Sequence, residues 1–411
     1  MPSFPGSGAE EAQKLGLPEL IPLRVSRQRT PLDGRRVNLV IPAISGRTRS
    51  FGGVATALRF LERLRSEFPY ARMVVTHEKS TDVGPQDWPG WDMGDGESAR
   101  QGIVFLPDLD STLPVAATDC FVATFWSTAV YLKQLLERQL QWFPGAVRRY
   151  VYLIQEYEPG FYPGSARHEY AKSTYRDDGW VIPILNSSPV KRYFDEQSLR
   201  FAEHYTFDPM FHPTLLRKHG ELRNVLKERL ILVYGRPTVP QNDFDLAVES
   251  LRTWAGAYHS AREWTLVSAG LPHPAVFLGD GITLHSCGTL TLDEYALYLA
   301  RCWAGVSFTF NASTSYTARE MAEFGAWVIA NQFEYRKPED LPRNVLVLDE
   351  ATPDNVARKL AWCCDQFRPD ATAAVPHLGA VFRRDGEEFP FVNSLLQSWF
   401  SERQPRSSLS V

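Results

Sequence analysis

The run from Phe308 to Ile329 holds the densest group of side chains that could bind a charged ligand. A small polar loop with Ser313, Ser315 and Thr317 separates an apolar, strand-like segment from a short helical one. Backbone N–H groups at the start of a helix are unpaired and carry partial positive charge, so this loop can cradle an anion. Glu320 allows two interpretations. It completes a T-x-x-E capping box with Thr317, or it accepts hydrogen bonds from a ribose diol.

A second candidate group is a glycine–arginine pair that follows the apolar run 230–234. Arg236 stands directly after Gly235 there. A guanidinium is permanently charged and can donate two parallel hydrogen bonds to phosphate oxygens, which suits a diphosphate. An ordinary surface arginine in a turn explains the pair equally well.

A third candidate loop follows the apolar run 282–285 and contains Gly288 and Thr289. The next helical segment begins close by, and Thr291 with Glu294 has the spacing of a T-x-x-E capping box. The loop could therefore border a ligand, or it could be no more than the start of a capped helix.

Two glycines, Gly52 and Gly53, separate the first strand-like run from the helix after it. They would let the backbone approach a ligand closely, although a tight turn alone also explains them. The full G-x-G-x-x-G pattern is missing, and the next strand, 74–77, does not end in an acidic residue. The sequence therefore gives no dinucleotide fingerprint, and no nicotinamide cofactor is expected.

Polar side chains also follow the strand-like run 150–154, where Gln155, Glu156, Tyr157 and Glu158 stand in a row. An amide, a phenol and two carboxylates at the end of a strand suggest a site that orients hydroxyl groups. Glutamates in a loop are more often simply solvated. Asn186 and two serines end the next run, and the serines have the spacing of a helix cap.

These groups must be positioned by alternating strands and helices, which begin at Arg36 and indicate βαβ units. The strands expected in the first half are 37–41, 72–76, 103–106, 120–124, 150–154 and 181–185. Apolar residues at helical spacing fall in 54–64 and 130–136. The second half repeats the pattern, with strands at 230–234, 264–267, 275–278, 282–285, 303–310 and 327–330 and helices at 244–254, 292–299 and 317–324.

The pattern predicts an α/β fold with two Rossmann-like domains and an active site in a cleft that both domains face. We expect a loose N-terminal extension over 1–33, a first domain over 34–208 and a second over 209–386. The proline-bounded segment 207–213 is the expected linker. A last helix, 392–400 within the segment 387–405, is expected to cross back to the first domain, ahead of a disordered tail that includes 406–411.

Composition sets limits on function. The 411 residues suggest two or three domains, and the net charge of -4 offers no basic surface for a nucleic acid. The five cysteines are scattered and show no metal-binding spacing, as in a reducing cytoplasm. The N-terminus lacks the pattern of a signal peptide, and no apolar run reaches the length of a membrane span. A cytoplasmic enzyme, soluble or held at the inner face of the membrane, is the expectation.

The glycine loop, the glycine–arginine pair and the run S-Y-x-x-x-E-M-A-x-F-G-x-x-V-I together resemble retaining GT-B glycosyltransferases of family 4. Two runs, Ile154–Pro163 and Ser315–Ile329, resemble the bacterial WsaF-type rhamnosyltransferases, whose donor is dTDP-β-L-rhamnose. The likeness spans about residues 36–400. It implies a GT-B fold in which the second domain binds the nucleotide sugar and the first binds a glycan or lipid-linked glycan acceptor.

The resemblance also implies roles for the candidate residues. Arg236, after Gly235, would bind the diphosphate and stabilise it as it departs, and Glu320 would bind the ribose. Glu156 would orient the acceptor hydroxyl or act as a base. The remaining donor-site and acceptor-site residues would be Gly52, Gly53, Gly288, Thr289, Ser313, Ser315, Tyr316, Thr317, Gln155, Tyr157 and Glu158.

The sequence departs from the family pattern at two places. Many family members carry a glutamate eight positions before the one matched by Glu320, and Ala312 stands there in this chain. Many also have a basic residue after the glycine–arginine pair, and 238–243 contains none. Asp108 and Asp110 match the letters of a D-x-D metal motif but are interpreted as an exposed loop, so neither a metal nor a cofactor is expected.

Three alternatives stay open at this stage. The enzyme could use a UDP- or GDP-sugar, it could be a nucleotide-sugar epimerase, or the chain could bind a nucleotide or sugar without catalysis. The acceptor, the linkage and the oligomeric state are not defined by the sequence. Peripheral membrane contact would suit a lipid-linked acceptor, although no basic amphipathic helix indicates it.

Overall fold

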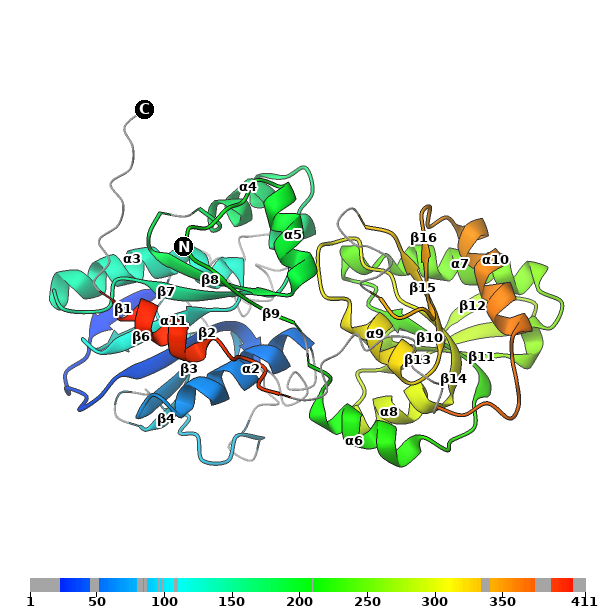
Figure 1. Cartoon of the computed structure of the whole chain (residues 1–411), viewed down its shortest axis with the longest axis horizontal. Helices are drawn as coiled ribbons and strands as arrows, with labels where there is room; N and C mark the ends of the chain where they lie inside the picture. Colours follow the sequence, from blue (N-terminus) through cyan, green and yellow to red (C-terminus); the bar gives the residue numbers. More distant parts are fainter. Residues whose placement is uncertain are drawn as a thin grey trace, which may run out of the picture. The chain divides into compact units, whose positions relative to one another are not determined.

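The computed structural model of the chain describes residues 23–44, 52–79, 84, 87–94, 97, 99–106, 110–176, 178–208, 210–333, 341–373 and 386–401. Two seven-stranded sheets and one small two-stranded sheet form its framework (Figure 1). Apart from the antiparallel pair β12–β13, every strand pair whose register is defined in these residues is parallel. The predicted α/β class with two Rossmann-like sheets is confirmed.

The first large sheet has the strand order β4-β3-β2-β6-β7-β8-β9. Its strands are β2 (Arg36–Ile44), β3 (Tyr70–Lys79), β4 (Gln101–Phe105), β6 (Asp119–Ala123), β7 (Tyr150–Ile154), β8 (Val181–Asn186) and β9 (Tyr205–Phe207). The order reverses between β2 and β6, which is the switch point of a doubly wound sheet. The helices along this part of the chain are α2 (Gly52–Arg65), α3 (Trp126–Trp142), α4 (Ala166–Ser173) and α5 (Ser188–Glu196).

The second large sheet has the order β12-β13-β11-β10-β14-β15-β16. Its strands are β10 (Glu228–Gly235), β11 (Thr265–Gly270), β12 (Val276–Gly279), β13 (Ile282–Gly288), β14 (Cys302–Val306), β15 (Trp327–Asn331) and β16 (Val345–Leu348). Helices α7 (Phe244–Ala257) and α10 (Pro353–Asp365) bury one face, and α6 (Pro213–Leu222), α8 (Leu292–Arg301) and α9 (Tyr316–Glu323) bury the other (Figure 1). Burial on both faces explains why the central strands β10, β14 and β15 are mostly apolar.

The chain packs as two compact units. The first contains the described parts of Met1–Leu153, Ser173–Pro183 and Phe391–Val411, and the second those of Ile154–Lys172 and Ile184–Pro390. The residues that follow β7 therefore belong to the second unit, together with the end of β8. The domain limits expected from the sequence, with their division at 208 and 209, stay a prediction.

The last helix, α11 (Val392–Trp399), packs within the first unit, as the predicted return of the C-terminal helix requires. Trp399 is only 1% exposed, and its indole nitrogen donates to the Arg149 carbonyl at 2.7 Å. Its ring also contacts Phe68. A buried tryptophan with a satisfied N–H is a strong anchor for a short terminal helix.

Two expectations about the elements were wrong. Structure begins before Arg36, because β1 (Arg24–Arg27) pairs in parallel with β5 (Thr112–Val115). With a single apolar residue in four, β1 has no alternation that could predict it. The strand expected over 303–310 ends at Val306, because the Asn331 side chain takes over the backbone N–H and carbonyl of Thr309 at 2.7 and 3.0 Å.

Among the helices that the described ranges contain, none combines the length and the apolar character needed to cross a bilayer.

Candidate active site

The carboxyl ends of β10, β11 and β13 meet at one edge of the second sheet, and glycines allow them to end close together. A Cβ on Gly235 would overlap the Ser268 hydroxyl. Gly270 has a φ of +148°, and a Cβ there would overlap the Gly235 carbonyl oxygen. Thr289, after the left-handed Gly288, donates from its hydroxyl to the Gly270 carbonyl at 2.8 Å. The expected donor-site residues Gly235, Gly288 and Thr289 are thus neighbours.

Arg236 leaves this edge directly after β10. Its Nη1 donates to the Tyr234 hydroxyl at 3.3 Å. Its Nε is buried and has no hydrogen-bond partner within the described part of the chain. A buried N–H without a partner costs free energy, so a guanidinium held in this way is suited to an oxyanion that supplies the missing acceptor.

Glu156 lies in the same unit, although it comes from the other half of the sequence. The Asn311 amide donates to the Glu156 carboxyl at 3.3 Å. Burial raises the pKa of Glu156 to about 7, while the hydrogen bond from Asn311 and the positive charge of Arg236 act to lower it. A carboxyl group with this pKa can hold or release a proton near neutral pH.

The segment after β7 and the loop after β14 are held together by their backbones. Glu156 and Ser313 form an antiparallel bridge, and the Tyr157 N–H donates to the Ala312 carbonyl at 2.8 Å. Asn311 is fully buried, and a Cβ on Gly160 would overlap its side-chain oxygen. The Glu156 carboxyl therefore borders the loop that contains Ala312.

A second anchor holds the same loop against the end of β8. The Asn186 amide donates to the Tyr316 hydroxyl at 3.0 Å, and the Thr314 hydroxyl donates to the Asn186 carbonyl at 3.1 Å. Ser315 has a φ of 54° and is the N-cap residue of α9. The left-handed turn at Ser315 thus starts α9 at Tyr316 and Thr317, whose N–H groups lie at the positive end of the helix.

The interpretation of Thr317 and Glu320 as a capping box was wrong, because the N-cap is Ser315 and Thr317 lies inside the first turn. The other T-x-x-E pair, Thr291 and Glu294, does form a capping box at the start of α8. Burial raises the pKa of Glu320 to about 7, and the hydroxyl of Tyr295 beside it acts to lower that pKa. Glu320 is therefore available to a ligand rather than used as a cap.

The two carboxyl groups belong to one continuous set of polar side chains. Arg236 connects Glu156 to Tyr234 through its charge and its hydrogen bond. Burial and the neighbouring Glu320 carboxyl raise the pKa of Tyr295, and Tyr234 adds a smaller effect in the same direction, so Tyr295 lies between the two. Two carboxyls with pKa values near 7 and one arginine in a single set indicate a functional site.

Several other expected residues are placed differently. The Tyr157 ring is buried among Tyr193 and Phe194, with ring centroids 5.0 and 5.8 Å away, so it packs in a core. Gln155 is partly buried, and Glu158 is almost fully buried where a short 3₁₀ turn begins.

The remaining expected residues lie in the first unit. Gly52 and Gly53 start α2. Ser50 and Phe51, which complete the glycine loop, lie outside the described residues, as does Asp108. Asp110 is exposed and lies 3.9 Å from Arg24.

Three residues of this set escaped the sequence analysis. Asn311 and Tyr234 stand inside the runs that drew attention, but nothing in their spacing marks them. Tyr295 stands inside a regular amphipathic helix, so its position beside Glu320 follows only from the packing of α8 against the second sheet.

Comparison with known proteins decides the family. Residues 36–188 match the model of the WsaF N-terminal domain, and residues 229–361 match that of the WsaF C-terminal domain. The chain belongs to the WsaF family. The expected resemblance to WsaF-type GT-B glycosyltransferases is thereby confirmed. No curated protein matches this WsaF chain significantly.

Solved structures agree on the fold. Sucrose-phosphate synthase from Thermosynechococcus elongatus is 12% identical, with a TM-score of 0.55 over 81% of this chain and 90% of that one. Anabaena HepE, solved with UDP and glucose, is 13% identical, with a TM-score of 0.55 over 82% and 92%. WaaG, a glycosyltransferase involved in lipopolysaccharide biosynthesis, is 10% identical, with a TM-score of 0.50 over 80% and 90%. This WsaF protein therefore has the GT-B glycosyltransferase fold.

Proposed function

We propose that this WsaF protein transfers L-rhamnose from dTDP-β-L-rhamnose to a hydroxyl group of a glycan or lipid-linked glycan, with retention of configuration and without a metal ion. The observation that carries the proposal is the Arg236 guanidinium: its charge acts on the partly buried Glu156 carboxyl group, and its buried Nε has no partner among the described residues. The WsaF family match supports the transfer of a sugar, and the donor rests on the resemblance of the two sequence runs.

Arg236 stabilises the leaving group in this mechanism. Negative charge builds up on the diphosphate as the bond to the sugar breaks. A guanidinium with a free N–H donor and the N-terminal amides of α9 stabilise that charge without rearrangement, which lowers the barrier. The Tyr234 hydroxyl, an acceptor for Arg236, helps to keep the guanidinium in place.

Glu156 orients the acceptor. In its ionised form the carboxylate accepts a hydrogen bond from the attacking hydroxyl and holds the hydroxyl oxygen toward the sugar. Attack takes place on the face that the leaving group occupies, and the departing phosphate oxygen takes the proton. No protein nucleophile is required, so Glu156 works through position and charge.

Glu320 holds the nucleoside. An ionised carboxylate accepts hydrogen bonds from both hydroxyls of a vicinal diol, whereas a protonated one accepts them poorly. The deoxyribose of a dTDP donor offers one ring hydroxyl to Glu320, whereas the ribose of a UDP or GDP donor offers two. Donor preference is therefore sensitive to this residue, and a UDP- or GDP-sugar is the alternative outcome of the test.

The test is the release of dTDP from dTDP-rhamnose in the presence of a panel of rhamnose-containing glycans. We expect acceptor-dependent release by the wild-type chain and a loss of about 100-fold or more in Arg236→Ala, the scale seen when one oxyanion-stabilising donor is removed. Arg229→Ala, which removes an exposed arginine at the opposite end of β10, is the matched control. Release without an acceptor would indicate an epimerase or a hydrolase, and no release with any donor would indicate a binding protein.

A further inference from the structure

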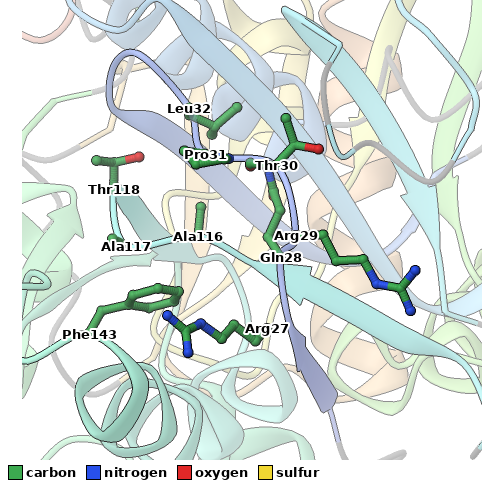
Figure 2. A pocket seen from close by; sticks show the side chains of 10 residues that line it. All are labelled: Arg27, Gln28, Arg29, Thr30, Pro31, Leu32, Ala116, Ala117, Thr118 and Phe143. Carbon is green, nitrogen blue, oxygen red and sulfur yellow. The ribbon is translucent and has the colours of Figure 1, made fainter.

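A cavity of about 440 Å³ lies in the first unit, and none of the residues assigned so far lines it (Figure 2). It is enclosed by the chain that follows β1, by the turn before β6 and by the end of α3. The residues that line it are Arg27, Gln28, Arg29, Thr30, Pro31, Leu32, Ala116, Ala117, Thr118 and Phe143.

The cavity lies at the amino ends of the first sheet's strands. Thr118 directly precedes β6, and its carbonyl accepts the N–H of Arg36, the first residue of β2, at 3.1 Å. Parallel α/β sheets bind their substrates beyond the carboxyl ends, which is where Gly52 and Gly53 start α2. The cavity is thus at the opposite edge of this sheet from the one that binds substrates in such folds.

The lining carries positive charge and no compensating acid. It contains two arginines, Arg27 and Arg29, and no Asp or Glu. Neither arginine lies within ion-pair distance of a carboxylate that the described ranges contain, whereas Arg24 on the same strand lies 3.9 Å from Asp110. Thr118 also lines the cavity, although its hydroxyl has almost no accessible surface.

One arginine is already held in position. The Arg27 guanidinium lies over the Phe143 ring, 5.0 Å from its centroid, and Figure 2 shows the two side chains next to each other. Stacking on an aromatic face restrains a guanidinium and leaves its N–H groups, which lie in its own plane, able to donate.

The wall between the two arginines is rigid. Gln28 is buried, its backbone N–H donates to the Val115 carbonyl at 2.9 Å, and its side-chain oxygen accepts from Arg36 at 2.6 Å. Its side-chain nitrogen donates to the Thr30 carbonyl at 2.8 Å. Arg27 and Arg29 are therefore presented by a segment that does not need to become ordered when a ligand binds.

We propose that this cavity binds a small organic phosphate of about monosaccharide size, either free or as the phosphorylated unit of a glycan. The Arg27 guanidinium would bind the phosphate oxygens, and Arg29, whose side chain extends to the opposite side in Figure 2, would add positive charge at the rim. Pro31, Leu32 and Phe143 would contact the carbon skeleton. The volume falls in the range of small-molecule sites. The proposal goes beyond the transfer reaction, which requires none of these residues.

Isothermal titration of the full chain with glucose 1-phosphate, inorganic phosphate and glucose tests the proposal. We expect glucose 1-phosphate to bind, inorganic phosphate to bind more weakly and glucose not to bind. We expect the double substitution Arg27→Gln with Arg29→Gln to weaken the binding of glucose 1-phosphate about tenfold or more, because at least one charge-assisted contact is lost. Both side chains are exposed, so the fold is retained, which the melting temperature checks.

Two control variants separate this site from other sources of binding. Arg24→Gln removes an arginine of the same strand that does not line the cavity, and it should bind as the wild type does. Arg236→Ala removes the proposed donor-site arginine and should also leave glucose 1-phosphate binding unchanged, whatever happens to the transfer reaction.

Four results would overturn the proposal. These are an absence of glucose 1-phosphate binding, equal binding by the double variant and the wild type, an equal loss in Arg24→Gln, and loss of binding in Arg236→Ala. A fifth result would replace the proposal with a membrane contact. In that case the protein would bind vesicles with anionic lipid, the double variant would not, and glucose 1-phosphate would not bind.

Discussion

At the scale of single residues, the fold changes the chemistry of Glu156 and Glu320 most, because burial raises the pKa of each carboxyl to about 7. In the unfolded chain the same groups ionise near their ordinary pKa of about 4.3. Protonation is thus coupled to folding in the acidic range, and either residue can be tested without knowing the substrate.

Glu156→Gln should change how stability depends on pH. As the pH rises from about 4.5 to 7, the carboxyl ionises first in the unfolded chain, so the unfolded state binds fewer protons and the free energy of unfolding falls. Above about pH 7 the carboxyl is ionised in both states and its contribution is constant. The variant lacks this group, so its free energy of unfolding should fall less across this interval.

Urea denaturation at several pH values from about 4.5 to 8 measures this dependence, with the exposed Glu263→Gln as the matched control. Glu320 contributes to the pH dependence of stability in the wild type and in both variants. Glu156→Gln should therefore lose only the part of that dependence that Glu156 causes. Identical pH dependence in Glu156→Gln and the wild type would show that the Glu156 carboxyl is not desolvated beside Arg236 in solution.

The sequence could name Glu156, Arg236 and Glu320 as candidates, but it could not join them. Each follows a different strand, and the strands before Glu156 and Arg236 belong to different sheets, so only the pairing of Glu156 with Ser313 shows that the two residues share one unit. The choice between cap and ligand-binding residue for Glu320 depended on where α9 begins. The left-handed turn at Ser315 decides that, and the T-x-x-E spacing alone does not reveal it.

At the scale of elements, the edge of the second sheet depends on glycines that let neighbouring strands end in contact. Gly270→Ala should lower the free energy of unfolding by more than about 2 kcal/mol, because φ of +148° is strained for any side chain and the new Cβ would overlap the Gly235 carbonyl. Gly256→Ala, in the exposed part of α7 with open space around it, should instead raise it by about 0.5–1 kcal/mol.

Chemical denaturation measures the free energy of unfolding of both variants, which should change in opposite directions. A Gly270→Ala variant as stable as the wild type would mean that β10 and β11 do not end in the contact described here.

Most elements could be predicted where an apolar pattern was complete. The limits of β7, Tyr150–Ile154, match the prediction, and α9 begins one residue earlier than expected. Helix α10 was missed although its signals are present: Thr352 caps it, Pro353 follows, and apolar residues recur at helical spacing. The early end of β14 could not be predicted, because a distant asparagine side chain replaces the strand partner of Thr309.

At the scale of the whole molecule, the two compact units should respond separately to damage. Trp399→Ala removes a fully buried anchor of α11 and leaves the Arg149 carbonyl without its indole donor, which should cost the first unit about 3–5 kcal/mol. Calorimetry should show one unfolding transition moved to lower temperature while the transition of the second unit is retained. Trp362→Ala, at a half-exposed tryptophan of α10, is the control and should cost much less.

A single unchanged transition in Trp399→Ala would mean that α11 is not part of the first unit's core. Because Arg236 and Glu320, the proposed donor-site residues, belong to the second unit, the variant should also keep its affinity for the nucleotide.

The central claim is that the second unit of this WsaF protein binds the nucleotide-sugar donor through Arg236. Thermal denaturation with dTDP, UDP, GDP and ADP and with dTDP-rhamnose, for the wild type and for Arg236→Ala, tests it most directly. A ligand at about 100 times its dissociation constant should add about 2.7 kcal/mol of stability. We predict selective stabilisation by dTDP and dTDP-rhamnose that disappears in Arg236→Ala, whereas no stabilisation by any nucleotide, or equal stabilisation of both proteins, would contradict the claim.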